Sequence, residues 1–225
     1  MGPVDLSLVL AIFHDRHPGV ELTVREESSE DLAEMLRVDE LDLAFLSVTE
    51  RIESHGLGLH ELVREELVVI VAQEHPLGKR RRVRMAELEG EEFISFRAGA
   101  RLRELLTTAG GSAGFEPRVK LESNESQRIR RMVARGMGVA ILPRSDAVAP
   151  GAEISILTLT HPSLSRDIAL AWREGRRHSP AAAELLELAR ATYADGQAKR
   201  RTRASRSPEP APSRPEATTR RKNRK

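Results

Sequence analysis

The chain has 225 residues and no cysteine, so it can form one large or two small globular lobes, without disulfides or thiolate zinc sites. Its aromatic content of 3% leaves little surface on which the bases of single-stranded nucleic acid could stack. Charge is unevenly distributed: residues 1–194 hold 25 basic and 31 acidic residues, a net charge of −6, whereas residues 195–225 hold 11 basic and 3 acidic ones, a net charge of +8.

The amino-terminal part carries no pattern typical of a membrane or secretion signal. Its longest apolar run, Leu6–Phe13, is much shorter than the ~20 residues that a membrane-spanning helix needs. Asp5 stands directly before this run, where a signal peptide would carry basic residues. We therefore expect a soluble cytoplasmic chain with no membrane partner.

The first part of the chain alternates between helical and strand periods. Apolar residues recur at helical spacing after Asp5 and predict one apolar helix face: Leu6, Val9, Leu10 and Phe13. A one-sided strand is predicted over 20–25, and Ser28 begins a second helix that leads to a buried strand over 41–46. The short connections predict parallel pairing of these two strands through right-handed crossovers.

The rest of the chain repeats this α/β alternation. Strands are predicted over 67–72, 92–96, 117–122, 139–142, 154–159 and 167–172, and helices over 99–109, 124–135 and 180–193. Ser179 followed by Pro180 is a typical helix start, and Gly136 is a typical helix end. Residues 195–225 hold no large aliphatic side chain, so we expect this basic tail to be disordered.

No residue pattern points to an enzyme. The run Gly110–Gly114 matches the G-x-S-x-G pattern of nucleophilic serines, but a helix precedes it and a strand follows it, which is the reverse of the context that such a serine needs. The seven histidines form no zinc-binding spacing. Neighbouring glutamates such as Glu26 and Glu27 are better explained as solvated surface than as acid–base pairs. We therefore predict no catalytic residue, no metal site and no cofactor.

Two basic segments could contact nucleic acid. The run Lys79–Arg82 is more simply explained as an exposed loop. The tail, 195–225, carries enough positive charge to bind phosphates without reading a base sequence, and a solubilising role explains it equally well. Neither segment indicates sequence-specific DNA binding.

Several short segments, taken in their order along the chain, resemble one known family. They are Phe13–Val24 (FHDRHPGVELTV), Leu41–Phe45 (LDLAF), Glu66–Val71 (ELVVIV), His75–Leu77 (HPL), Phe93–Phe96 (FISF), Gly114–Pro117 (GFEP) and Met132–Pro143 (MVARGMGVAILP). Over residues 5–194 the chain resembles the effector-binding, or substrate-binding, domain of LysR-type transcriptional regulators. The likeness rests on the number and order of these segments.

The resemblance implies an α/β domain with two lobes, like that of the type II periplasmic binding proteins, in which a small molecule binds between the lobes. Lobe I would comprise residues 1–68 and 164–194, and lobe II would comprise residues 69–163. Two crossover strands would join the lobes, near residues 65–69 and 160–168.

The resemblance also implies where the ligand binds. In this architecture, polar groups at the junctions of loops and helices converge on the ligand. Matched motif by motif, six effector-binding residues are expected: Ser47, Ser95, Phe96, Arg97, Asn124 and Glu125. Arg97 and the helix N-termini favour an anionic effector. The alternative is structural, with Asn124 as a helix cap and Ser95 completing a strand end.

The chain departs from the family pattern before its first helix. The winged helix-turn-helix and linker helix of the family, which bind DNA and dimerise, have no counterpart before Gly2. The first strand of the effector domain is also unmatched, as is the Ser/Thr-bearing turn after it, because Pro3–Asp5 lead directly into the first helix. A fragment, a misplaced start or a truncated paralogue would each explain this departure.

We therefore predict the regulatory domain of a LysR-type bacterial transcriptional regulator, which senses a small metabolite by cleft closure within a homo-oligomer. DNA would be bound only through the missing amino-terminal domain, or non-specifically through the tail. Two alternatives remain open. One is a stand-alone small-molecule-binding protein of the periplasmic type, which would need a signal peptide. The other is a nucleic-acid accessory protein that acts through its basic tail.

Overall fold

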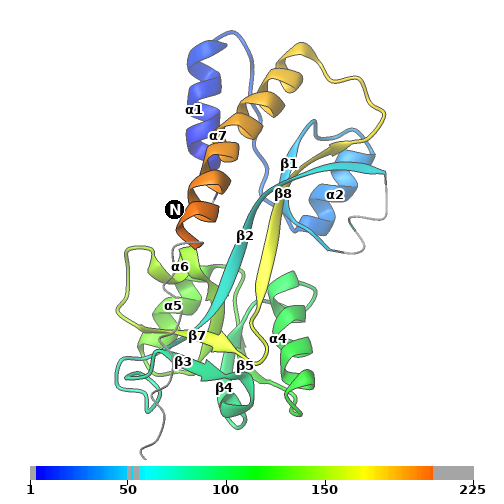
Figure 1. The fold of residues 1–225 in the computed structure, drawn as a ribbon. Coiled ribbons are helices and arrows are strands. Elements are labelled where there is room, and N and C mark those ends of the chain that lie inside the picture. The colour runs from blue at the N-terminus through cyan, green and yellow to red at the C-terminus, as the bar shows by residue number, and fades with distance from the viewer. Residues whose placement is uncertain (1–3, 50–51, 53–55, 205–225) are drawn as a thin grey trace, which may run out of the picture.

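One long strand connects the two halves of the computed structural model, which describes residues 4–49, 52 and 56–204 (Figure 1). In this strand, β2 (Leu57–Val71), residues 57–66 pair antiparallel with β8 (Ser165–Arg173). Residues 67–71 pair instead with β6 (Ala140–Pro143) and β7 (Ser155–Thr160). We refer to the elements above and below this change of partners in Figure 1 as the upper and lower halves.

The upper half places helices on both faces of an antiparallel sheet (Figure 1). Besides β8 and the first part of β2, it contains α1 (Leu6–Arg16), α2 (Ser29–Arg37), β1 (Ala44–Ser47) and α7 (Pro180–Ala204). β1 is the outermost strand in the order β1-β8-β2-β7-β3 and pairs antiparallel with β8. Two buried clusters fill this half, one around Phe13 of α1 and one around Leu36 of α2.

The lower half is formed by one continuous stretch of chain. It contains the second part of β2, then β3 (Arg82–Arg84), the 3-10 turn η1 (Met85–Leu88), β4 (Glu92–Ser95), α4 (Arg101–Ser112), β5 (Arg118–Glu122), α5 (Ser126–Ala134), β6, α6 (Arg144–Val148) and β7. Alternate residues of β2 face two different clusters: Val69 packs with Phe93, and Ile70 packs with Ile129. Because both faces of the strand are buried, the sequence there is a continuous apolar run.

Three helix starts lie where the sequence predicts them. Asp5 accepts a hydrogen bond from the Leu8 amide at 3.1 Å and caps α1. The hydroxyls of Ser28 and Ser179 accept equivalent bonds, each 3.1 Å long, at the starts of α2 and α7. These short polar side chains satisfy N–H groups that have no partner inside the helix.

Two glycines determine how the chain passes from α5 into β6. Gly136 has a φ of +73° and its amide donates to the Val133 carbonyl oxygen at 2.9 Å, so it ends α5 as predicted. Gly138 has a φ of +148°, and a Cβ atom there would lie 2.4 Å from the carbonyl oxygen of Glu92. This close approach lets the Val139 amide donate to the same oxygen at 2.9 Å.

Residues 20–25 are not the strand that their alternation predicts. Residues 21–25 are exposed, including Leu22 and Val24 at 36% and 53%, and the order of paired strands leaves the segment out. Its predicted parallel partner, β1, pairs antiparallel with β8 instead. Alternation reports which face of a segment is apolar, but a strand also needs a neighbour for its backbone groups.

Two further outcomes concern the helices. Gly110–Ser112 complete α4 and β5 follows, so the G-x-S-x-G match lies in a helix–strand context, as predicted. α7 continues to Ala204, whereas the sequence predicts its end at Tyr193, and the Gln, Ala, Lys and Arg residues over 197–204 are good helix formers. Residues 205–225 lie outside the described part of the chain. Within the described ranges, no helix combines the length and the apolarity that a membrane span requires.

Candidate functional site

Strands β4 and β5 end side by side at one edge of the lower half. They are parallel, with Ser95 opposite Glu122, so their carboxyl ends lie at the same edge. The Ser123 amide donates to the Ser95 carbonyl oxygen at 3.0 Å, which holds the two strand ends together. The turns that follow bring together five of the six predicted effector residues: Ser95, Phe96, Arg97, Asn124 and Glu125.

Two helices start at this edge without a side-chain cap. α4 begins after Ala100 and α5 begins after Glu125, and neither side chain accepts a hydrogen bond from its helix. In the part of the chain that the structure describes, the first N–H groups of both helices can therefore serve another acceptor. Both helix dipoles add positive potential here, so this edge is suited to an anion.

The side chain of Ser123, and not that of Asn124, bonds to the backbone just before α5. The Ser123 hydroxyl accepts a hydrogen bond from the Glu125 amide at 3.1 Å, and the residue is buried. Asn124 is exposed and lies one position before the helix cap, so the alternative that it caps α5 is wrong. The Glu125 carboxylate forms ion pairs with Arg128 and Arg131, at 3.0 and 3.3 Å.

The other turn combines a buried and an exposed part. Ser95 is buried, Phe96 is half-buried and Arg97 is exposed. Arg103, which the sequence patterns do not identify, donates to the Phe96 carbonyl oxygen at 3.5 Å and pairs with Glu122 at 2.9 Å. Arg103 therefore connects the end of β5 to the loop before α4. It belongs to no motif, and only the neighbourhood of the two strands identifies it.

Ser47 lies apart from the other five predicted residues. It is the last residue of β1, and its amide donates to the hydroxyl of Ser29, the first residue of α2, at 3.0 Å. Over the described ranges, no hydrogen bond or ion pair links Ser47 to the lower half. The six predicted residues thus form one group of five and one single residue in the opposite half.

One acidic side chain of β4 lies at the opposite end from this edge. Glu92, at the amino end of β4, accepts a hydrogen bond from Lys120, which holds the pKa of the Glu92 carboxyl below its usual value. Among the described residues, no group of three or more His, Asp or Glu side chains could hold a metal ion.

A buried ion pair connects the two strands that pass between the halves. Glu65 of β2 is 4% exposed, and its Oε2 accepts hydrogen bonds from Nε and Nη2 of Arg166 on β8, at 2.9 and 2.7 Å. Its Oε1 accepts a bond from the Ser145 amide of α6 at 3.0 Å. The next residue, Glu66, pairs with Arg144 at 2.7 Å, but both of these side chains are 41% exposed.

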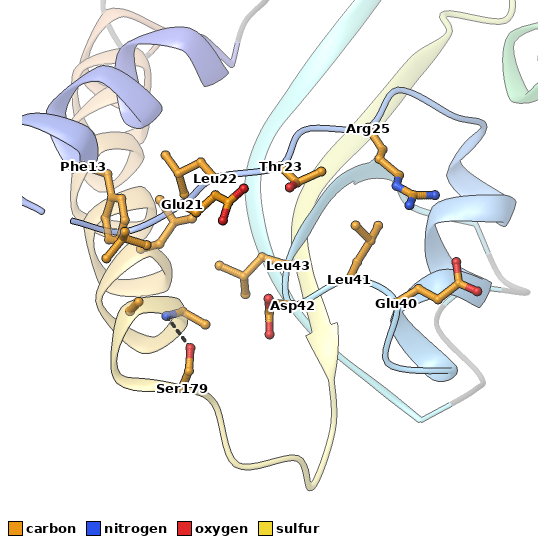
Figure 2. A pocket seen from close by; sticks show the side chains of 14 residues that line it. Phe13, Glu21, Leu22, Thr23, Arg25, Glu40, Leu41, Asp42, Leu43 and Ser179 are labelled. Atoms are coloured by element: carbon orange, nitrogen blue, oxygen red, sulfur yellow. Dashed lines mark hydrogen bonds between the residues drawn. The ribbon is translucent and has the colours of Figure 1, made fainter. Parts of the chain in front are cut away.

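A hollow of about 460 Å³ lies in the upper half and contains none of the six predicted residues. Figure 2 shows it between two extended segments, with Leu22 and Thr23 on one side and Leu41, Asp42 and Leu43 on the other. It is therefore a separate feature from the edge formed by β4 and β5.

Comparison with known proteins gives consistent matches. A family model described as the LysR substrate binding domain matches residues 1–194. The transcriptional dual regulator GltC of Bacillus subtilis is 29% identical over 183 residues, which are 81% of this chain and 61% of that protein. This chain thus spans about three-fifths of the length of that relative.

Solved structures show the same fold. The effector-binding domain of QuiR in complex with shikimate has a TM-score of 0.75 at 22% identity, covering 87% of this chain and 93% of that one. The regulatory domain of Synechocystis CcmR in complex with 2-PG has a TM-score of 0.76 at 24% identity, covering 84% and 90%. Both likenesses extend over nearly all of the compared domains.

Proposed function

This chain belongs to the family of LysR substrate-binding domains, and from that premise we propose that it is the effector-sensing part of a transcriptional regulator. The observation that carries the proposal is the edge where β4 and β5 end. Two uncapped helix N-termini meet there, next to the exposed Arg97. Fixed N–H donors at such an edge are suited to hold one small molecule in a defined orientation.

The proposed effector is a small anion, such as a carboxylate. The N-termini of α4 and α5 supply partial positive charge, and Arg97 supplies a full one. Shikimate, which is bound in the QuiR domain of the same fold, is also a carboxylate. Glu125 already forms ion pairs with Arg128 and Arg131, so its carboxylate would hold the side chains around the site in place more than it would repel the ligand.

We propose that the two halves are lobes that close on the effector. The core clusters support boundaries close to residues 1–68 with 164–194 for lobe I and 69–163 for lobe II. Only Leu67, Val68 and Leu164, next to these boundaries, pack with a cluster of the other lobe. Closure would bring Ser47 of lobe I to a ligand held by lobe II. A ligand that binds the closed form more tightly shifts the population toward that form.

The actions of a complete regulator follow as further proposals. In this role the domain would work in a homo-oligomer, and effector binding would change how that oligomer engages DNA. Sedimentation at several protein concentrations, with and without effector, measures the assembly state. A monomer under all of these conditions would contradict the proposed assembly.

The basic segment after residue 194 is proposed to bind DNA non-specifically. Its net charge of +8 follows a body of net charge −6, and this separation favours binding to phosphates. Deleting residues 205–225 should weaken retention on DNA. It should also flatten the plot of the logarithm of the DNA association constant against the logarithm of salt concentration, because the slope changes by about 0.9 for each phosphate that the protein neutralises. An unchanged salt dependence would exclude this role of the tail.

The effector site is tested by thermal shift with a panel of small carboxylates, followed by calorimetry on each hit. Arg97→Ala should weaken binding of a hit by about 10- to 100-fold, because a hydrogen bond to a charged group contributes about 1.5–3 kcal/mol. Asn124→Ala should weaken it less. Arg118→Ala is the matched control, since Arg118 is 80% exposed at the other end of β5. Equal affinity of the Arg97 and Arg118 variants would refute the site.

A further inference from the structure

The two halves carry net charges of opposite sign. Residues 1–68 and 164–194 hold 10 basic and 20 acidic residues, a net charge of −10, whereas residues 69–163 hold 15 basic and 11 acidic ones, a net charge of +4. Five of these 15 basic residues stand within six positions, Lys79–Arg84, which we call the basic run. Without the basic run the lower half would have a net charge of −1, so this one segment makes the lower half positive.

The basic run lies at the margin of the lower half (Figure 1). Its last three residues form β3, which is an outermost strand in the order β1-β8-β2-β7-β3. Within β3, Val83 is buried, and the arginines on either side of it are exposed on one face of the strand. The three basic residues of the preceding turn are exposed as well. All five cations of the basic run therefore face solvent.

One carboxylate serves two of these five cations. Glu87 pairs with Arg80 at 2.8 Å and with Arg84 at 3.4 Å. The other three, which form no ion pair among the described residues, are Lys79, Arg81 and Arg82. Exposed cations without a carboxylate partner can pair with an anion from outside the chain at no cost in internal contacts.

The backbone that carries these cations is held by hydrogen bonds. The Arg80 amide donates to the Leu77 carbonyl oxygen at 2.9 Å within the turn, and the Thr158 amide of β7 donates to the Arg81 carbonyl oxygen at 3.0 Å. β3 then pairs parallel with β7 over all of its three residues. Because the backbone is already fixed, a partner has to order only the side chains, which lowers the entropic cost of binding.

The surroundings of the basic run indicate what kind of partner fits it. No large apolar side chain of residues 72–90 is exposed, whereas protein interfaces have an apolar centre. The only aromatic side chain in this range is that of His75, so the bases of a single strand would find little surface on which to stack. The phosphates of a DNA duplex need neither feature, and they pair well with guanidinium groups.

We propose that the basic run binds the phosphate backbone of duplex DNA without reading its base sequence. A duplex presents one negative charge per ~1.7 Å of its axis. An extended acidic peptide presents at most one per ~3.5 Å, so a duplex attracts a compact group of cations more strongly. The net charges of −10 and +4 orient the domain with its lower half toward the duplex. This surface is separate from the effector edge and from the basic segment after residue 194.

The test measures binding of labelled DNA duplexes of two unrelated sequences to the full chain, by fluorescence anisotropy at several salt concentrations. The variant combines Arg81→Gln with Arg82→Gln, which removes two exposed, unpaired charges. Each neutralised phosphate changes the slope of log association constant against log salt by about 0.9, which corresponds to about eightfold in affinity at about 0.1 M salt. We expect both duplexes to bind about 8- to 60-fold more weakly, with the slope smaller by about 0.9 to 1.8.

Two further variants serve as matched controls. Arg25→Gln with Arg177→Gln removes the same charge from two exposed positions of the upper half, and it should leave DNA affinity nearly unchanged because salt screens distant charges. Arg81→Lys with Arg82→Lys keeps the charge of the basic run and should retain most of the affinity. The tail is intact in every variant, so a failure of its proposed role would not change this comparison.

Three results would overturn the proposal. Equal losses in the two glutamine variants would show that only the net charge of the chain matters, and an unchanged affinity of the Arg81 and Arg82 variant would show that the basic run does not contact DNA. A loss in the lysine variant as large as that in its glutamine counterpart would exclude phosphate pairing by charge. Displacement of the DNA by polyglutamate at an equal concentration of charge would assign the surface to an acidic protein instead.

Discussion

The buried ion pair between Glu65 and Arg166 provides the sharpest test of how the two halves are held together. Glu65→Ala removes a carboxylate that accepts three hydrogen bonds, two from Arg166 and one from the Ser145 amide. The Arg166 side chain is only 20% exposed and would lose the anion that balances its charge. Both the missing bonds and the uncompensated cation act against the folded state.

The magnitude follows from burial. Removing one partner of a buried ion pair typically costs about 3–5 kcal/mol, most of it from the charge left behind. For a domain of this size, 1 kcal/mol corresponds to about 2–4 °C in Tm, so Glu65→Ala should lower Tm by about 10 °C. Arg166→Met in the same chain should restore part of this loss, because it removes the unpaired charge.

The neighbouring residue supplies a matched control. Glu66 pairs with Arg144 at 2.7 Å, but with both side chains 41% exposed, so Glu66→Ala should cost no more than about 1 kcal/mol. Urea unfolding followed by circular dichroism measures the free energy of unfolding of both variants. Equal losses at positions 65 and 66 would refute the argument that burial, and not the ion pair itself, sets the cost.

Three further predictions concern other parts of the chain. Hydrogen bonds from the Arg84 backbone N–H and then from the Arg80 side chain lower the pKa of Glu87 from 4.5 to about 2. The stability that the ionised carboxylate contributes is therefore present above pH 4.5 and is lost as pH falls to about 2. An NMR titration that places the pKa of Glu87 near 4.5 would contradict this. Gly58→Ala should displace the indole of Trp172, which lies 2.3 Å from the position of the added Cβ. Trp172 is the single tryptophan of the chain, so an unchanged fluorescence spectrum would disprove the close approach of its indole to Gly58. Arg130→Ala should lower Tm by several degrees, because the Arg130 guanidinium donates to three carbonyl oxygens of residues 146–152. A loss in Tm within about 1 °C would show that these hydrogen bonds contribute little.

Much of the fold could be predicted because the deciding signals are local. The caps at Asp5, Ser28 and Ser179 act within one helical turn, so the residue type and its spacing identify them. The apolar run of β2 from Leu67 is equally clear, since both of its faces are buried. The first part of β2, residues 57–66, could not be predicted because polar side chains interrupt its alternation.

The sequence predictions fail where the structure of a segment depends on a residue or strand that lies beside it in the fold. Segment 20–25 has the pattern of a strand, but pairing depends on what lies beside it, and alternation contains no information about that. The alternative in which Asn124 caps α5 is wrong, because the helix starts after Glu125, and Ser123 bonds instead to the Glu125 amide two residues ahead of it. Arg103 joins the candidate site only through the parallel pairing of β4 and β5, which no motif announces.

The lower half is contiguous in the chain, whereas the upper half is not. The buried clusters of the lower half use residues 67–159, and those of the upper half combine residues 9–62 with residues 170–189. During synthesis the lower half is therefore complete before β8 and α7 have left the ribosome, and α1 must wait for them with its apolar face exposed. The order of synthesis thus assigns early folding to the half that contains β4 and β5, and late folding to the half that contains β1 and β8.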